Sequence, residues 1–153
     1  MKLLENKIPP PVLAVLFGLA MWGVSFVTPA VEIGSMVSFI ISLVVLVLGV
    51  FFCLAGVFSF RKAKTTVNPL NPESATSLVS SGIYKVSRNP MYVGFALILL
   101  AWALYLASPV AVVGVLGFVF IINRLQIEPE ERALLKLFGS EFDDYQSIVR
   151  RWL

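Results

Sequence analysis

The run Val37–Phe60 constrains the fold more than any other part of the chain. It holds 24 residues without a charged side chain and ends at the basic pair Arg61-Lys62. About 20 apolar residues are enough for a helix to cross a bilayer. The whole chain agrees with this prediction, because it is 58% hydrophobic and only 14% charged, whereas soluble domains carry about 25% charged residues.

Three further apolar runs have helical length, and together the four predict spans at about 10–28, 37–60, 91–107 and 109–124. Ser108-Pro109 reads as a cap followed by a first helical residue, so the last two spans are expected to form a tight hairpin. A polar loop (61–90) and an amphipathic tail (125–153) complete the chain, with Pro129 and Ser140 marking helix starts in the tail. The predicted fold is an all-α polytopic integral membrane protein in one domain, residues 1–153, with a helical C-terminal tail.

The positions of the basic residues predict the orientation. All 12 lie in the N-terminal arm, in the 61–90 loop or from Arg124 onward, whereas the link between the first two spans holds Glu32 and no Lys or Arg. Under the positive-inside rule, both termini and the long loop are cytoplasmic. We therefore expect an integral protein of a bacterial inner membrane or an equivalent one.

Two polar clusters should meet at the cytoplasmic end of the hairpin. The chain has no histidine and one cysteine, Cys53, which excludes a Cys/His metal centre, so no metal site is predicted. Each cluster also has a purely structural interpretation: Asn89-Pro90 as a capped helix start, Arg124 as a snorkelling side chain, and Glu130-Glu131 as first-turn acids. The clusters are Tyr84, Arg88, Asn89 and Tyr92 before the third span, and Arg124, Gln126, Glu128, Glu130 and Glu131 after the fourth.

The same segments resemble a family of membrane methyltransferases, grouped with isoprenylcysteine carboxyl methyltransferase and phospholipid N-methyltransferases. The resemblance covers roughly residues 60–153. Its motifs are Gly82-Ile-Tyr84, Arg88-Asn-Pro-Met-Tyr92 with Gly94, Arg124, Pro129-Glu-Glu-Arg132 with Leu134, Phe138-Gly139, Tyr145, and Val149-Arg-Arg-Trp-Leu153. The chain departs from the family at Asn89, where many relatives have His, so that position has no titrating group.

The resemblance implies S-adenosylmethionine as the methyl donor, bound at the cytoplasmic ends of the last two spans. It implies catalytic roles for Arg88, Arg124 and Glu130. One wall of the donor site would consist of Tyr84, Arg88, Asn89, Pro90, Met91, Tyr92 and Gly94, and the other of Glu130 and Glu131.

The expected activity is methyl transfer to a lipid-like or other hydrophobic acceptor at the cytoplasmic membrane face. The expected partners are this amphiphilic acceptor and membrane lipids, with no nucleic acid, and small-residue helix faces permit a homodimer. Two alternatives remain at this point: an NADPH-dependent membrane reductase related to sterol reductases, and a non-catalytic four-helix membrane binding or assembly protein.

Overall fold

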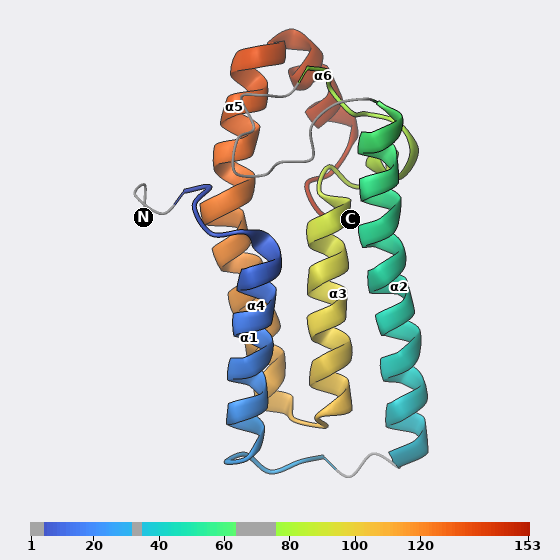
Figure 1. Ribbon diagram of the computed structural model, residues 1–153, viewed down its shortest axis with the longest axis vertical. Helices are drawn as coiled ribbons and strands as arrows, with labels where there is room; N and C mark the ends of the chain where they lie inside the picture. The colour runs from blue at the N-terminus through green and yellow to red at the C-terminus, as the bar shows by residue number, and fades with distance from the viewer. Residues whose placement is uncertain (1–4, 32–34, 64–75) are drawn as a thin grey trace.

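The computed structural model describes residues 5–31, 35–63 and 76–153, and this part of the chain is helical, without strands. Figure 1 shows upright helices with a smaller helical cap at one end. The elements are α1 (Pro10–Ser25), α2 (Ser35–Lys62), the 3-10 turn η3 (Gly82–Lys85), α3 (Pro90–Tyr105), α4 (Pro109–Ile122), the π-helical turn η4 (Asn123–Ile127), α5 (Glu128–Phe138) and α6 (Ser140–Ile148).

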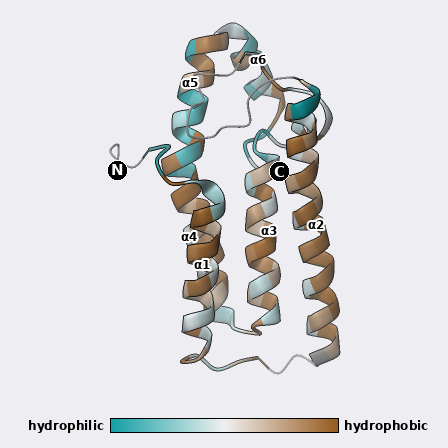
Figure 2. Cartoon of the chain, viewed as in Figure 1, coloured by the Kyte–Doolittle hydropathy of each residue, from teal (hydrophilic) through white to brown (hydrophobic). Residues whose placement is uncertain are grey.

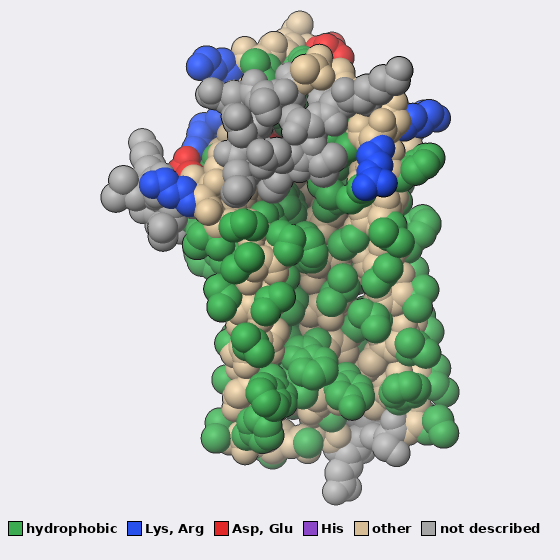
Figure 3. Space-filling model, in the orientation of Figure 1, with side chains coloured by type: hydrophobic (Ala, Val, Ile, Leu, Met, Phe, Trp, Pro, Cys, Tyr) green, Lys and Arg blue, Asp and Glu red, His purple; other side chains and the backbone are tan. Residues whose placement is uncertain are grey.

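The four expected apolar segments are all helical, but they differ in length. Two helices are long and apolar enough to cross a membrane: residues Met36–Lys62, and the continuous helix Pro109–Phe138. Helices α1 and α3 have 16 residues each, which corresponds to about 24 Å at 1.5 Å per residue. Apolar residues fill the long part of the molecule, whereas polar and charged residues gather at the cap (Figures 2 and 3).

Small residues let α2 and α3 pack with their backbones close together. A Cβ atom added at Gly94 would lie 2.7 Å from the carbonyl oxygen of Gly49 and 2.9 Å from the amide nitrogen of Cys53. One added at Gly56 would overlap the side chain of Met91. Gly94 and Met91 therefore pack against α2, which holds α3 in a fixed position below the polar cap.

The helix that begins at Pro109 does not stop near residue 124, as the sequence had predicted. It passes through η4 directly into α5, and Figure 1 shows α4 and α5 as one column. Proline removes an N–H and crowds the carbonyl four residues earlier, and the π-helical turn accommodates Pro129. The N–H of Glu128 bonds to Asn123 O, and the carbonyl of Leu125 accepts from the N–H of Asn6 at 2.9 Å.

The prediction that Ser140 caps α6 was also wrong. Gly139 has a φ of 51°, a left-handed conformation that glycine adopts at low cost. The N–H groups of Phe142 and Asp143 both bond to the carbonyl of Gly139, at 3.1 Å. Ser140 is therefore the first helical residue, and α6 folds back over the loop that precedes α3.

Candidate functional site

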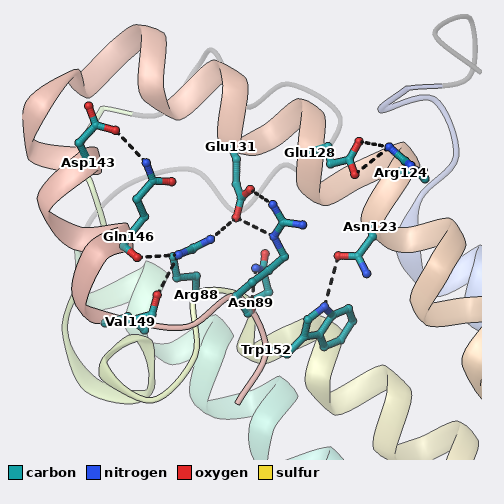
Figure 4. Close-up of polar contacts among 11 residues, drawn as sticks. Arg88, Asn89, Asn123, Arg124, Glu128, Glu131, Asp143, Gln146, Val149 and Trp152 are labelled. Atoms are coloured by element: carbon teal, nitrogen blue, oxygen red, sulfur yellow. Dashed lines mark hydrogen bonds and ion pairs between the residues drawn. The ribbon is translucent and has the colours of Figure 1, made fainter.

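Arg88 lies at the centre of the polar cap, in the loop between η3 and α3. Its Nη1 donates to the carbonyl oxygens of Gln146 (3.0 Å) and Val149 (2.8 Å), at the end of α6. Its Nη2 lies 2.7 Å from Glu131 Oε1 on α5, and the Arg88 side chain is only 12% exposed. One guanidinium thus joins α5, α6 and the start of α3 (Figure 4).

A second guanidinium binds the same carboxylate. Arg151 donates from Nε to Glu131 Oε1 at 3.1 Å and from Nη2 to Oε2 at 2.5 Å. Two cations therefore compensate one carboxylate that is 16% exposed, and charge-assisted bonds of this kind are among the stronger ones. The sequence predicted the proximity of Arg88 and Glu131, but it assigned no role to Arg151. The only signal for Arg151 was its place in the C-terminal motif.

Asn89 occupies the position before α3, yet its side chain does not cap the helix, contrary to the prediction. Its Nδ2 donates to the carbonyl of Arg151 at 2.9 Å, while the N–H of Arg88 bonds to the carbonyl of Arg150 at 2.9 Å. The side-chain amide of Asn89 is thus bonded to the C-terminal segment 149–153 and not to the first turn of α3. The first N–H groups of α3 thus lack a side-chain cap among the described residues.

Glu130 faces a different part of the cap from Glu131. Its Oε2 accepts from the hydroxyl of Tyr92 at 3.1 Å, so the pair joins α5 to the first turn of α3. Glu130 lies beyond the apolar part of the long helix. Burial raises the pKa of its carboxyl from 4.5 to about 7; the Tyr92 hydrogen bond lowers this pKa, and the charge of Glu131 raises it. The carboxyl therefore titrates near neutral pH.

Tyr84 lies next to this pair. Burial, followed by the charge of Glu130, raises the pKa of its hydroxyl well above the usual value. The Tyr84 carbonyl accepts from the hydroxyl of Tyr145 at 2.7 Å, and its ring meets that of Phe60 edge-on at 5.3 Å. Two buried tyrosines, Tyr84 and Tyr92, and the half-buried Glu130 thus form a second group beside the Arg88–Glu131–Arg151 network.

Four of the expected site residues lie elsewhere. Arg124 is 53% exposed and pairs with Glu128 at 3.1 Å, and Figure 4 shows this pair apart from the Arg88–Glu131 pair. Met91 and Gly94 face α2, as described above. Pro90 is buried as the first residue of α3. Tyr84, Arg88, Asn89, Tyr92, Glu130 and Glu131 are the predicted residues that the structure brings together.

Three buried side-chain polar atoms have no partner among the described residues: Asn6 Oδ1, Arg88 Nε and Gln126 Oε1. Gln126 lies on the π-helical turn, is fully buried, and donates from Nε2 to the carbonyl of Ile8 at 2.7 Å. In the described part of the chain, no three His, Cys, Asp or Glu side chains lie where they could hold a metal ion. Arg88 Nε and Gln126 Oε1 thus remain available for a further hydrogen bond.

Comparison with known proteins shows which family shares these features. The sequence model of the phospholipid methyltransferase family matches residues 37–141. An uncharacterized protein of Haemophilus influenzae is 48% identical over 63 residues, which is 41% of this chain and all of that protein. Protein-S-isoprenylcysteine O-methyltransferase A of Arabidopsis thaliana is 26% identical over 107 residues, 70% of this chain and 54% of the relative. The Saccharomyces cerevisiae protein-S-isoprenylcysteine O-methyltransferase is 32% identical over 80 residues, 50% of this chain and 32% of the relative.

The chain spans about half or less of the length of these two methyltransferases. No solved structure matches it. The family match includes both the loop that carries Arg88 and the helix that carries Glu130, and it ends before the C-terminal segment that holds Arg151.

Proposed function

The chain belongs to the phospholipid methyltransferase family, and we propose that it transfers a methyl group from S-adenosylmethionine to a lipid-like or other hydrophobic acceptor at the cytoplasmic membrane face. The observation that carries the proposal is the match over residues 37–141, which contains both the Arg88–Tyr92 segment and the Glu130-Glu131 pair.

The arrangement in the membrane is part of this proposal. Helices α1 to α4 cross the bilayer with both termini in the cytoplasm of a bacterial cell or an equivalent compartment. The charged cap at one end of the apolar helices supports this orientation (Figure 3). At the other end, Phe26 and Val27 are 71% and 82% exposed, as expected for a short link at the opposite interface.

The residues of the cap fit the proposed donor. S-adenosylmethionine supplies an electrophilic methyl group on a sulfonium, together with a carboxylate, an ammonium and ribose hydroxyls. The uncapped N–H groups at the start of α3 suit a carboxylate. Glu130 can accept from an ammonium or a hydroxyl, and the faces of Tyr84 and Tyr92 attract a cation. Glu131 is already compensated by two arginines, so its role is to position the chain around the site.

The protein contributes orientation and exclusion of water, which are the main requirements of methyl transfer. An acceptor carboxylate is already ionised and needs no base. An amine acceptor must lose a proton, and the Glu130 carboxylate, which titrates near pH 7, is the group that we assign to receive it. Arg88 acts through the C-terminal segment that it holds, and Arg124 belongs to the rim of the cap.

The test is transfer of a labelled methyl group into a total lipid extract, paired with calorimetry of the purified protein in detergent. S-adenosylmethionine or its demethylated product should bind, and Glu130→Ala should weaken this binding about tenfold or more. Arg132→Ala is the matched control, because Arg132 lies on the same helix and pairs with Glu5 away from the site. Binding of NADPH in place of either ligand would support a reductase, and binding of none of the three would support a non-catalytic protein.

A further inference from the structure

The segment that precedes α1, residues 5–9, lies beside the junction of α4 and α5 and bonds to the π-helical turn η4 (Figure 1). The N–H of Asn6 donates to the carbonyl of Leu125 at 2.9 Å. Two residues later, the carbonyl of Ile8 accepts from Gln126 Nε2 at 2.7 Å. The two bonds involve consecutive residues of η4, so this pre-α1 segment holds the turn directly.

Both bonds are shielded from water. Gln126 is fully buried and Leu125 is 5% exposed, and Ile8 packs against the hydrophobic core. Pro129 has no N–H to bond the carbonyl four residues earlier, so Asn6 is the donor that satisfies Leu125. Asn6 has a φ of 53°, a conformation that is uncommon outside glycine but enriched in Asn and Asp. The backbone at Asn6 is thus shaped to deliver its N–H to the turn.

The C-terminal segment bonds to the same turn. Trp152 Nε1 donates to Asn123 Oδ1 at 3.2 Å (Figure 4), and Asn123 Nδ2 donates to the carbonyl of Val119 at 2.9 Å. The ion pair between Glu5 and Arg132 adds little, because the Arg132 side chain is 58% exposed and exposed pairs are weak. The turn is therefore held mainly by buried or partly buried hydrogen bonds from two segments that are distant in the sequence.

The register of η4 decides which side chain of α5 faces Tyr92. The N–H of Glu128 bonds to the carbonyl of Asn123, five residues earlier, so this turn holds one residue more than an α-helical turn. Without the extra residue, every later residue would rotate about the axis by about 100°, the angle of one residue at 3.6 per turn. Pro129 would then face Tyr92, and Glu130 would lose its 3.1 Å hydrogen bond with the Tyr92 hydroxyl.

We propose that the pre-α1 segment is a positioning element of the candidate site: Asn6 and Gln126 hold the π-helical turn in the register that directs Glu130 towards Tyr92. The contribution of Glu130 to donor binding rests on the proposed function, whereas the register rests on the contacts alone. The family match begins at residue 37, so the role of the pre-α1 segment does not come from that match.

Two substitutions at Asn6 separate its N–H from its side chain. Asn6→Pro removes the N–H and fixes φ near −65°, so the bond with Leu125 is lost. Asn6→Gly keeps the N–H, adopts a positive φ at low cost, and removes an oxygen that is buried without a partner among the described residues. Asn6→Gly should therefore behave like the unaltered protein. Gln126→Met keeps the side-chain length but lacks the donor, and it should behave like Asn6→Pro.

The first measurement is the register of α5, which needs no bound donor. Spin labels are placed at Arg61→Cys, at the exposed end of α2, and at Leu135→Cys on α5, which is 42% exposed. The full-length protein carries Cys53→Ser and is studied in nanodiscs by pulsed electron paramagnetic resonance. A second pair replaces the Leu135 label by one at Leu137, which is 44% exposed and lies about 200° further round the helix.

A rotation of about 100° moves a side chain on the surface of a helix 10–12 Å across by about 8 Å. Because the two α5 labels point in different directions, at least one distance to Arg61 should change by several ångströms in Asn6→Pro and in Gln126→Met. Both distances should stay unchanged in Asn6→Gly. They should also stay unchanged in Gly49→Ala, a destabilised control whose added Cβ would lie 2.9 Å from the carbonyl of Gly94, away from the turn.

The second measurement is donor binding, followed by calorimetry across neutral pH. Asn6→Pro should lower the affinity for S-adenosylmethionine about tenfold, and it should flatten the pH dependence that Glu130 provides. Asn6→Gly should keep both the affinity and the pH dependence. A variant that only lost stability would have a lower Tm but would keep the pH dependence, so the shape of the profile separates positioning from stability.

Three results would overturn the proposal. Unchanged label distances in Asn6→Pro and Gln126→Met would mean that Pro129 alone sets the register. Equal changes in Asn6→Gly and Asn6→Pro would assign the effect to the Asn6 side chain, and changed distances with an unaltered pH profile would mean that the register does not position Glu130 for the donor. Absence of donor binding in the unaltered protein would contradict methyl transfer, while the label distances would still test the register.

Discussion

The Arg88 guanidinium connects α5 with the end of α6, through Glu131 and the carbonyls of Gln146 and Val149. Arg88→Ala removes the donor for the carbonyls of Gln146 and Val149 and one cation from the Glu131 carboxylate, which is 16% exposed. Breaking a largely buried pair of this kind costs about 3–5 kcal/mol, and we expect a little less, about 2–4, because Arg151 still compensates Glu131. Thermal unfolding in detergent, followed by circular dichroism, measures the loss.

Arg124→Ala is the internal control for Arg88→Ala. Arg124 is 53% exposed and its partner Glu128 is 31% exposed, and exposed pairs contribute about 0–1 kcal/mol. Equal losses of stability in the two variants would contradict the structural role given to Arg88. A fall in donor binding in Arg88→Ala with unchanged stability would instead indicate direct contact with the donor.

The raised pKa of Glu130 predicts that stability and donor binding change with pH in opposite directions. Because its folded-state pKa is about 7, above the usual 4.5, the folded protein holds a proton that the unfolded chain has lost. The contribution of Glu130 to the stability of the free protein should therefore be largest below pH 4.5 and decline as the pH rises through 7. Binding of a cationic donor should instead strengthen through pH 7, by up to about tenfold per pH unit below that pKa.

Calorimetry across this range, with Glu130→Gln as the comparison, tests the second direction. Glutamine keeps the shape and can still accept from Tyr92, but it does not titrate. The variant should bind weakly at all pH values and lose the slope. A slope that persists in Glu130→Gln would assign the titration to another group.

At the level of elements, a substitution at Gly94 tests how closely α3 packs on α2. A Cβ at this position would meet backbone atoms of Gly49 and Cys53, which yield less readily than a side chain. Gly94→Ala should therefore cost about 1–3 kcal/mol through overpacking. Gly23→Ala is the matched change, because nothing lies within 4 Å of its added Cβ, and it should be neutral or stabilising by up to about 1 kcal/mol. Thermal unfolding of both variants decides, and a neutral Gly94→Ala would contradict the close α2–α3 packing.

The apolar helices could be predicted from the sequence because their signals are local. Long uncharged runs, Ser108-Pro109 and Asn89-Pro90 placed the helices within a few residues, and the Ser108 side chain does cap α4 by accepting from Ala111. The continuous α4–α5 helix could not be predicted this way. Pro129 is a helix-start signal unless a distant donor, here the N–H of Asn6, satisfies the carbonyl that it frees.

The candidate site shows the same limit. The proximity of Arg88 and Glu131 could be predicted from the hairpin. Arg88 lies just before α3 and Glu131 shortly after α4, and a hairpin brings these two helix ends together. Arg151 reaches Glu131 only because α6 folds back over the loop before α3. The same fold-back places the carbonyl of Arg151 next to Asn89, which therefore donates to it and does not cap α3. Neither has a local signature, so tertiary contacts overrode the cap that Asn89 would otherwise form.

The whole molecule makes a prediction about its orientation in the membrane. On the face that Figure 3 shows, charged side chains lie at the cap end. The opposite end exposes Val27 beside Thr28, whose hydroxyl lies 3.0 Å from that of Ser108. In a Cys53→Ser background, Val27→Cys should react with a membrane-impermeant maleimide added outside intact bacterial cells that express the protein. Leu153→Cys, 59% exposed at the cap, should react only after the membrane is opened, because the basic residues beside it favour the cytoplasm. The reverse pattern would place the Tyr92–Glu130 pair outside the cell, away from a nucleotide-derived donor, and would contradict both the orientation and the proposed reaction.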